Sequence, residues 1–238
     1  MAKRKPPYKL KIVLEHSDSI FRPSLVGDKN PFSIIMYAAS TLVFEKLVAK
    51  GYMRHFIVIF SVVGSFMLVI SSLLLAAGLK GSYDALMNWT YMVFMVLLLP
   101  FIFYFGDTYY AMQLKHALYL GNRMSAKGKA GEEPRPRTIQ WNSTTLSVLH
   151  AVQYSNAEQF SINDFALSAG VVRGTMQRLL NGMKRVGMLT NISGKWSYPG
   201  IVFEAYRPEG HGFATQKLSK ADQQRLQYLF RVLCFVGF

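Results

Sequence analysis

Cationic and amide side chains recur at helical spacing in the stretch VVRGTMQRLLNGMKRVG, residues 171–187. A rotation of about 100° per residue gathers one set on a single helical face: Gly174, Arg178, Asn181 and Arg185, flanked by Gln177 and Lys184. Arginine reaches guanine edges or phosphate oxygens, and asparagine and glutamine pair with adenine. No Asp or Glu occurs from Val171 to Phe203. The chemistry that this face predicts is the binding of a polyanion.

The sequence carries no pattern that is typical of an enzyme. Its five histidines are scattered, and none has the HxxxH or HExxH spacing of a metal site. It has no GxxxxGKS/T phosphate loop and no GxSxG nucleophile elbow. The single cysteine, Cys234, excludes a disulfide framework within one chain, and we predict that it is a small buried apolar residue. We therefore expect no enzymatic activity, no metal and no cofactor.

The opposite face of the same helix is apolar and predicts how the helix packs. Apolar residues follow the spacing i, i+3, i+4, i+7 and i+10: Met176, Leu179, Leu180, Met183 and Val186. Two short helices are predicted before it, at 145–155 after the cap residues 141–144, and at 162–170 after Ser161. Gly187 ends the third helix, and two short strands follow, MLTNI and KWSYP, joined through Ser193-Gly194.

This order of elements, in INDFALSAGVVRGTMQRLLNGMKRVGMLTNISGKWSY, resembles the winged helix-turn-helix family over residues 144–198. Ala166 and Gly170 match the small residues near that family's turn, and residues 171–175 match the start of its recognition helix. Leu180, Met183 and 187–189 match the apolar end of that helix before the wing. The resemblance implies a recognition helix in the major groove of DNA and a wing against the DNA backbone.

The resemblance also assigns candidate DNA contacts. Arg178 and Arg185 would contact guanine edges or phosphates, and Gln177 or Asn181 would pair with adenine. The remaining candidates suit phosphate positioning: Arg173, Thr175, Lys184 and, on the predicted wing, Lys195. Gly174 and Gly182 depart from the family's pattern, since each costs a helix about 1 kcal/mol relative to alanine. They permit close approach to a surface, or mark a shifted helix boundary. Two alternatives stay open: a merely solvated polar face, and a winged domain that docks protein.

The composition and two long uncharged runs predict a membrane protein. Hydrophobic residues make up 51% of the 238 residues and charged residues only 17%, against about 25% charged in an average soluble domain. Residues 56–79 and 85–106 carry no charge, and as helices they span about 36 Å and about 33 Å, more than the roughly 30 Å of a hydrocarbon core. We predict two transmembrane helices.

The distribution of charge predicts the topology of this hairpin. The net charge of +14 divides into +6 over residues 1–55 and +8 over residues 107–238, with none over the predicted turn Lys80–Asp84. Because positive residues concentrate on the cytoplasmic side, we expect a multi-pass protein of the inner membrane with both termini in the cytoplasm. Ser61 and Ser65, with Gly64 beside them, allow either another helix to approach or the hairpin to pack on itself.

Four segments follow from these patterns. We expect a cytoplasmic basic arm, MAKRKPPYKLK, and an interfacial or partner-facing helix after Pro31 within 1–55, then the membrane hairpin with a cytoplasmic extension at 56–123. A linker rich in Gly, Pro and charge covers 124–140, and the winged-helix domain covers 141–238. In the last helix Ser219 is the cap and five residues share a side: Leu226, Leu229, Phe230, Leu233 and Val236. That side packs on the domain, pairs with a second copy, or lies on the membrane.

The predicted fold class is mainly α: a transmembrane helical hairpin followed by a cytoplasmic winged helix-turn-helix domain of α+β type. The predicted function is a membrane-anchored winged-helix DNA-binding protein, a regulator or a factor that tethers DNA at the inner membrane. Its partners would be the lipid bilayer and double-stranded DNA. The alternative is a non-enzymatic docking subunit of a membrane-embedded secretion or conjugative DNA-transfer apparatus, with protein partners or further copies of the chain.

Overall fold

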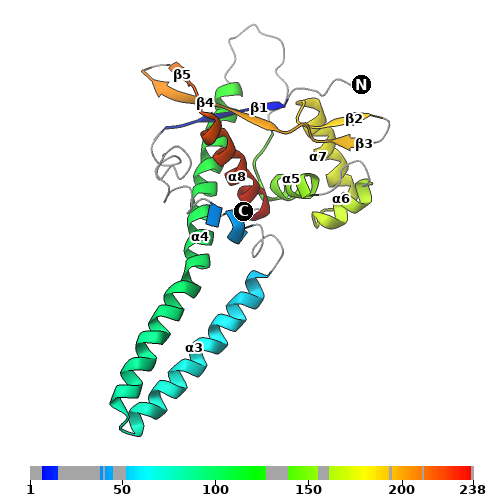
Figure 1. Ribbon diagram of the computed structural model, residues 1–238. Helices are drawn as coiled ribbons and strands as arrows, with labels where there is room; N and C mark the ends of the chain where they lie inside the picture. The colour runs from blue at the N-terminus through cyan, green and yellow to red at the C-terminus, as the bar shows by residue number, and fades with distance from the viewer. Residues whose placement is uncertain are drawn as a thin grey trace. The chain divides into compact units, whose positions relative to one another are not determined.

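A computed structural model of the chain describes residues 7–15, 38–39, 41–44, 52–126, 139–154, 161–192, 195–210 and 212–236. The described part is mainly helical with a small mixed sheet (Figure 1). Contacts divide the chain into two units, which we call the hairpin unit, Ile35–Asp107, and the mixed unit, Met1–Ile34 with Thr108–Phe238. Most of the predicted linker, 127–138, and most of the helix predicted after Pro31 lie outside the described residues; 38–39 and 41–44 are helical.

The hairpin unit consists of α3, Met53–Ala76, and the first part of α4, Lys80–Ala126. The turn predicted at Lys80–Asp84 is wrong, because those residues already form the first turn of α4. The chain reverses over Ala77–Leu79, where Gly78 has φ +72° and the Leu79 N–H donates to the Leu74 carbonyl at 3.0 Å. Glycine is favoured there, since a left-handed residue after a helix satisfies its last carbonyls without a Cβ penalty.

The two helices of the hairpin pack through one stripe of α3. Its least exposed residues are spaced three and four apart: Phe56, Phe60, Val63, Gly64, Met67, Ile70, Ser71 and Leu74. Phe60 lies 4.7 Å from Phe94 between ring centroids, and a Cβ at Gly64 would lie 3.0 Å from the Phe94 ring. Ser61 and Ser65 are exposed. Of the two uses predicted for these small residues, Gly64 therefore serves the packing of the hairpin on itself.

Both helices are long and apolar enough to cross a membrane. The most apolar windows have a mean hydropathy of 2.5 in α3 and 1.9 in α4, and only 11% and 6% of these windows is buried. The core helix of a soluble protein would be mostly buried instead. The hydroxyl groups of Ser71, Ser72 and Thr90 donate to carbonyls four residues earlier in their own helices, so they need no water.

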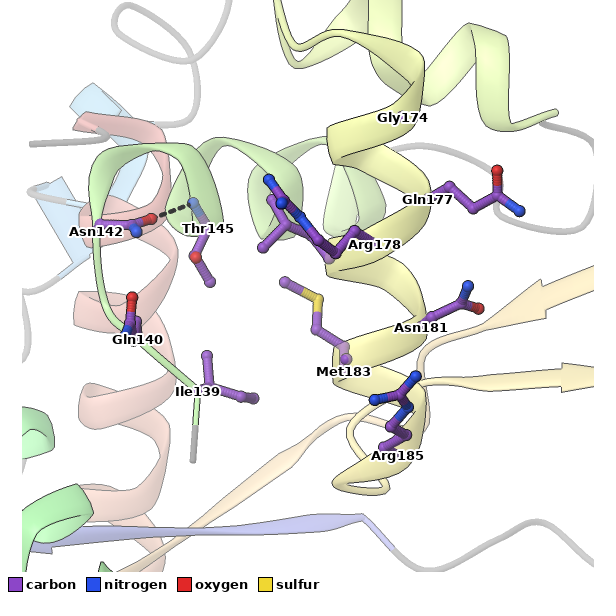
Figure 2. A pocket seen from close by; sticks show the side chains of 12 residues that line it. Ile139, Gln140, Asn142, Thr145, Gly174, Gln177, Arg178, Asn181, Met183 and Arg185 are labelled. Atoms are coloured by element: carbon purple, nitrogen blue, oxygen red, sulfur yellow. Dashed lines mark hydrogen bonds between the residues drawn. The ribbon is translucent and has the colours of Figure 1, made fainter. Parts of the chain in front are cut away.

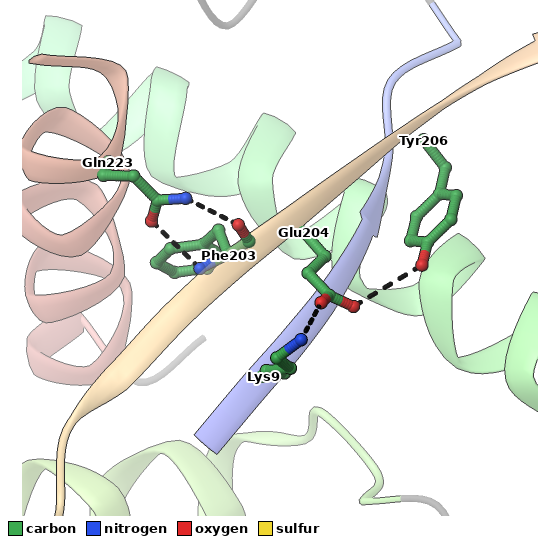
Figure 3. Close-up of polar contacts among 5 residues, drawn as sticks. All are labelled: Lys9, Phe203, Glu204, Tyr206 and Gln223. Atoms are coloured by element: carbon green, nitrogen blue, oxygen red, sulfur yellow. Dashed lines mark hydrogen bonds and ion pairs between the residues drawn. The ribbon is translucent and has the colours of Figure 1, made fainter. Parts of the chain in front are cut away.

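The mixed unit is built around a three-stranded sheet in the order β1-β4-β5. Strand β1, Tyr8–Val13, runs parallel to β4, Ile201–Glu209, and β5, Gly212–Gln216, pairs antiparallel with the other end of β4. The segment from Tyr8 to Lys11, predicted as part of a basic arm, is thus a strand. Its two lysines made this strand resemble a basic arm. Lys9 pairs with Glu204 at 2.8 Å (Figure 3), and the Lys11 ammonium group lies over the Tyr206 ring.

One face of this sheet is covered by helices. Ile201, Phe203 and Ala205 of β4 are buried, and α8, Lys220–Val236, packs against β4. The Ser219 hydroxyl accepts from the Asp222 N–H at 3.1 Å, so the predicted cap is confirmed. All five residues of the predicted apolar side are buried, which confirms packing within the unit. Cys234 is 1% exposed, and burial raises the pKa of its thiol.

The carboxyl-terminal part of α4 also belongs to the mixed unit, where Ala111, Leu114, Ala117 and Leu118 are buried. Gly121 brings α4 against β1: a Cβ at this position would overlap the carbonyl oxygen of Lys11 and lie 2.7 Å from its carbon. The third layer of the unit is α5, Ser143–Tyr154, which packs against α8. The remaining elements of the unit carry the residues singled out in the sequence: α6, Ile162–Ser168, α7, Arg173–Arg185, β2, Thr190–Ile192, and β3, Lys195–Ser197.

Candidate nucleic-acid interface

The candidate site is carried by two helices that meet at a tight turn. Helix α6, Ile162–Ser168, begins with a capping box: the Asp164 N–H donates to the Ser161 hydroxyl, and the Ser161 N–H donates to the Asp164 carboxylate. The Ser161 hydroxyl also donates to this carboxylate. These hydrogen bonds hold the pKa of the Asp164 carboxyl below its usual value. Gly170, with φ +62°, turns the chain, and the Val171 N–H donates to the Ala166 carbonyl at 2.9 Å. The predicted small residues at 166 and 170 thus form the turn.

Helix α7, Arg173–Arg185, separates into an apolar and a polar face as predicted. Met176, Leu180 and Met183 are buried, whereas Leu179 and Val186 are half-buried. The helix ends at Gly187, which has φ +84°. The predicted site residues of α7 are exposed, apart from the half-buried Thr175: Arg173, Gln177, Arg178, Asn181, Lys184 and Arg185. Helix α7 begins at Arg173 rather than at Val171, so the boundary is shifted and Gly174 stands in its first turn, whereas Gly182 lies inside the helix.

The predicted strands after α7 pair as an antiparallel hairpin. Strand β2, Thr190–Ile192, and β3, Lys195–Ser197, are joined through Ser193-Gly194, which lies outside the described residues. Trp196 is buried and anchors β3 in the mixed unit. Lys195 is the first residue of β3, opposite Ile192, and so lies apart from the other candidates, all of which are on α7.

A cavity of about 740 Å³ lies along α7 and is lined on its other side by Ile139, Gln140, Asn142 and Thr145 (Figure 2). Four of the predicted site residues line it: Gln177, Arg178, Asn181 and Arg185. Three others on α7, Arg173, Thr175 and Lys184, do not. The Asn142 side chain accepts from the Thr145 N–H at 2.9 Å and caps α5 as predicted, so it holds this wall in place.

The charged side chains that line the cavity, Arg178 and Arg185, are both positive. None of its lining residues is acidic. Neither Arg178 nor Arg185 forms an ion pair or a hydrogen bond with another residue of the described part. Asp164 is the nearest acidic residue before Val171 in the sequence, and its carboxylate accepts a hydrogen bond from Ser161 at the start of α6. Positive charge along this face is therefore not neutralised by the described residues around it, which favours anion binding.

The comparisons with known proteins add no family. Neither a scan of protein-family models nor searches of curated proteins and of solved structures find a match to this chain.

Part of this geometry does not follow from the sequence. The sequence predicts Ile139 and Gln140 as the end of a linker, whereas both line the cavity opposite α7. No local signal predicted this, because the contact joins segments more than thirty residues apart in the sequence. Among the described residues, no group of three or more His, Cys, Asp and Glu is placed to hold a metal ion.

Proposed function

We propose that this protein is a membrane-anchored DNA-binding protein, in which α5, α6, α7 and the β2–β3 hairpin act as a winged helix-turn-helix. The observation that carries the proposal is the exposed face of α7. It presents arginine, lysine and amide side chains, and the chain has no acidic residue from Val171 to Phe203. An exposed, uniformly basic helix face with amides interleaved is the electrostatic and hydrogen-bonding footprint of duplex DNA recognition.

The order of elements supports the same proposal. Helix α7 follows α6 after a tight turn, its apolar stripe is buried, and a two-stranded hairpin comes next. In this arrangement α7 would enter the major groove and the hairpin with Lys195 would lie against the backbone. Arg173, Thr175 and Lys184, on α7 but outside the cavity, suit contacts to neighbouring phosphates.

The hairpin unit supplies the anchor in this proposal. Helix α3 and the part of α4 in the hairpin unit expose large apolar side chains, including Val62, Phe66 and Ile102, as a lipid-facing surface requires. The net charges of +6 and +8 on the two flanks favour the cytoplasm for both termini. DNA bound by α7 would then be held at the inner membrane.

The decisive measurement is salt-dependent binding of duplex DNA by the full chain in zwitterionic lipid nanodiscs. We expect fluorescence anisotropy to give an affinity whose logarithm falls linearly with the logarithm of salt, with a slope of about −0.9 for each phosphate contacted. Binding of two unrelated duplexes separates a specific from a non-specific component. An affinity absent at low salt for every duplex would refute the proposal.

The topology is tested by labelling single cysteines with a membrane-impermeant maleimide in spheroplasts. Cys234 is buried, and a C234A background removes it. Gly81 is exposed and a Cβ there meets nothing within 4 Å, so G81C should fold and react without lysis. K217C, at an exposed position after β5, should react only after lysis. Reaction of K217C in intact spheroplasts, or protection of G81C, would contradict both termini being cytoplasmic.

A docking subunit of a secretion or DNA-transfer apparatus is the second candidate, and one observation favours it. Leu167 is 86% exposed and Val172 is 78% exposed, on either side of the α6–α7 turn. Two large apolar side chains exposed at one turn suit a contact with a protein better than a contact with phosphate. If duplex DNA does not bind, this turn becomes the surface at which a protein partner is sought.

A further inference from the structure

The cavity along α7 has walls of mixed chemistry. Ile139, Leu179 and Met183 give it a largely apolar lining, and Arg178 and Arg185 add two guanidinium groups (Figure 2). The sugar–phosphate backbone of a nucleic acid offers both features, because each phosphodiester is followed by a deoxyribose with an apolar face.

The two arginines are spaced for a repeating anion. They lie seven residues apart on α7, which is two helical turns and about 10 Å of rise. One strand of duplex DNA carries a charge for about every 3.4 Å of axis, so the two guanidinium groups would contact different phosphates. The absence of a carboxylate from the lining leaves both charges available to them.

Gly174 and Gly182 line the same cavity and have no role in the packing of the described residues. A Cβ at either position would meet nothing within 4 Å, and neither residue has a positive φ. Crowding and backbone conformation therefore do not explain glycine here. For Gly182, which lies inside α7, a partner that approaches the helix backbone does explain it.

We infer that the cavity seats a strand of DNA through its sugar–phosphate backbone, with Arg178 and Arg185 on phosphates and the apolar lining against deoxyribose. This inference rests on the proposed function, and it divides the candidate DNA contacts on α7 between the bases and the backbone. Gln177 and Asn181 also line the cavity, but their side chains point away from the Ile139–Thr145 wall in Figure 2, so they are left to read base edges. Arg178 and Arg185, which the sequence allowed to contact either bases or phosphates, hold the backbone.

The first test compares charge-removing variants of the full chain in nanodiscs on two unrelated duplexes. R178A should weaken binding to both duplexes by the same factor and make the salt slope shallower by about 0.9. Its deficit relative to wild type should therefore shrink about 3.5-fold between about 50 and about 200 mM salt. R178A/R185A should double the change in slope. K217A removes one exposed charge away from the cavity and should leave the slope unchanged, whereas N181A should alter the ratio between the duplexes.

The second test fills the cavity without removing charge. G182L places a side chain in open space, so circular dichroism and the melting temperature should show an intact fold. Binding to both duplexes should fall at least as far as in R178A. If wild type binds DNA and both G182L and R178A bind it with the same affinity as wild type, the inference is overturned and the proposed function stands. A change of sequence preference in R178A would overturn it as well, by assigning Arg178 to a base. No binding by wild type would instead overturn the proposed function.

Discussion

G121A is expected to destabilise the mixed unit by about 1–3 kcal/mol, although alanine is the better helix former. The added methyl group would overlap the Lys11 carbonyl of β1. Because the atoms that it meets are backbone atoms of β1, no flexible side chain can move aside to make room. Relief requires α4 or β1 to shift, which loosens the pairing of β1 with β4. Thermal unfolding in mild detergent, followed by the fluorescence of the buried Trp141 and Trp196, measures the change.

The matched control is G182A, the same substitution inside another helix. A Cβ at Gly182 meets open space, so G182A should stabilise the unit by up to about 1 kcal/mol. Hydrogen exchange separates the mechanisms further, because G121A should lose protection in Tyr8–Val13 while G182A should not. Equal stabilisation by both variants would show that α4 does not approach β1 closely.

Q223A is expected to lower the free energy of unfolding by about 2–4 kcal/mol, because it removes the side-chain amide that pairs with backbone groups at the edge of β4. Strand β5 pairs with β4 only from Ala205 to Glu209. Before that point the Gln223 side chain accepts from the Phe203 N–H at 3.0 Å and donates to the Phe203 carbonyl at 2.6 Å (Figure 3). Gln227 donates to the Ile201 carbonyl at 2.9 Å. A buried backbone group left unpaired costs about 1–3 kcal/mol.

Q224A is the control for this variant. Gln224 is the next residue of α8 and is exposed, so its replacement should change stability by less than about 0.5 kcal/mol. The two variants are compared by the same thermal unfolding and by light scattering, because an uncovered strand edge invites pairing with another chain. Indistinguishable melting of Q223A and Q224A would show that the glutamine does not complete the ladder.

The candidate site was predictable where it depends on one helix. The spacing of Met176, Leu180 and Met183 defines the buried stripe of α7, and rotation by 100° then exposes Arg178 and Arg185. The cavity was not predictable, because its second wall comes from Ile139 to Thr145. Whether a basic helix face is flat or hollowed depends on which distant segment packs beside it.

The sequence by itself determined the features that depend on neighbours within a few residues. These are the caps at Ser161 and Ser219, the faces of α7 and α8, and the two long uncharged runs, since side chains and backbone groups within one or two turns decide them. Only the tertiary structure decided that Tyr8–Val13 pairs with a strand some 190 residues later, and that Gln223 serves as a strand neighbour. Unpaired backbone groups of β4 must find partners wherever the chain folds back on them, and no local pattern of residues records which segment will do so.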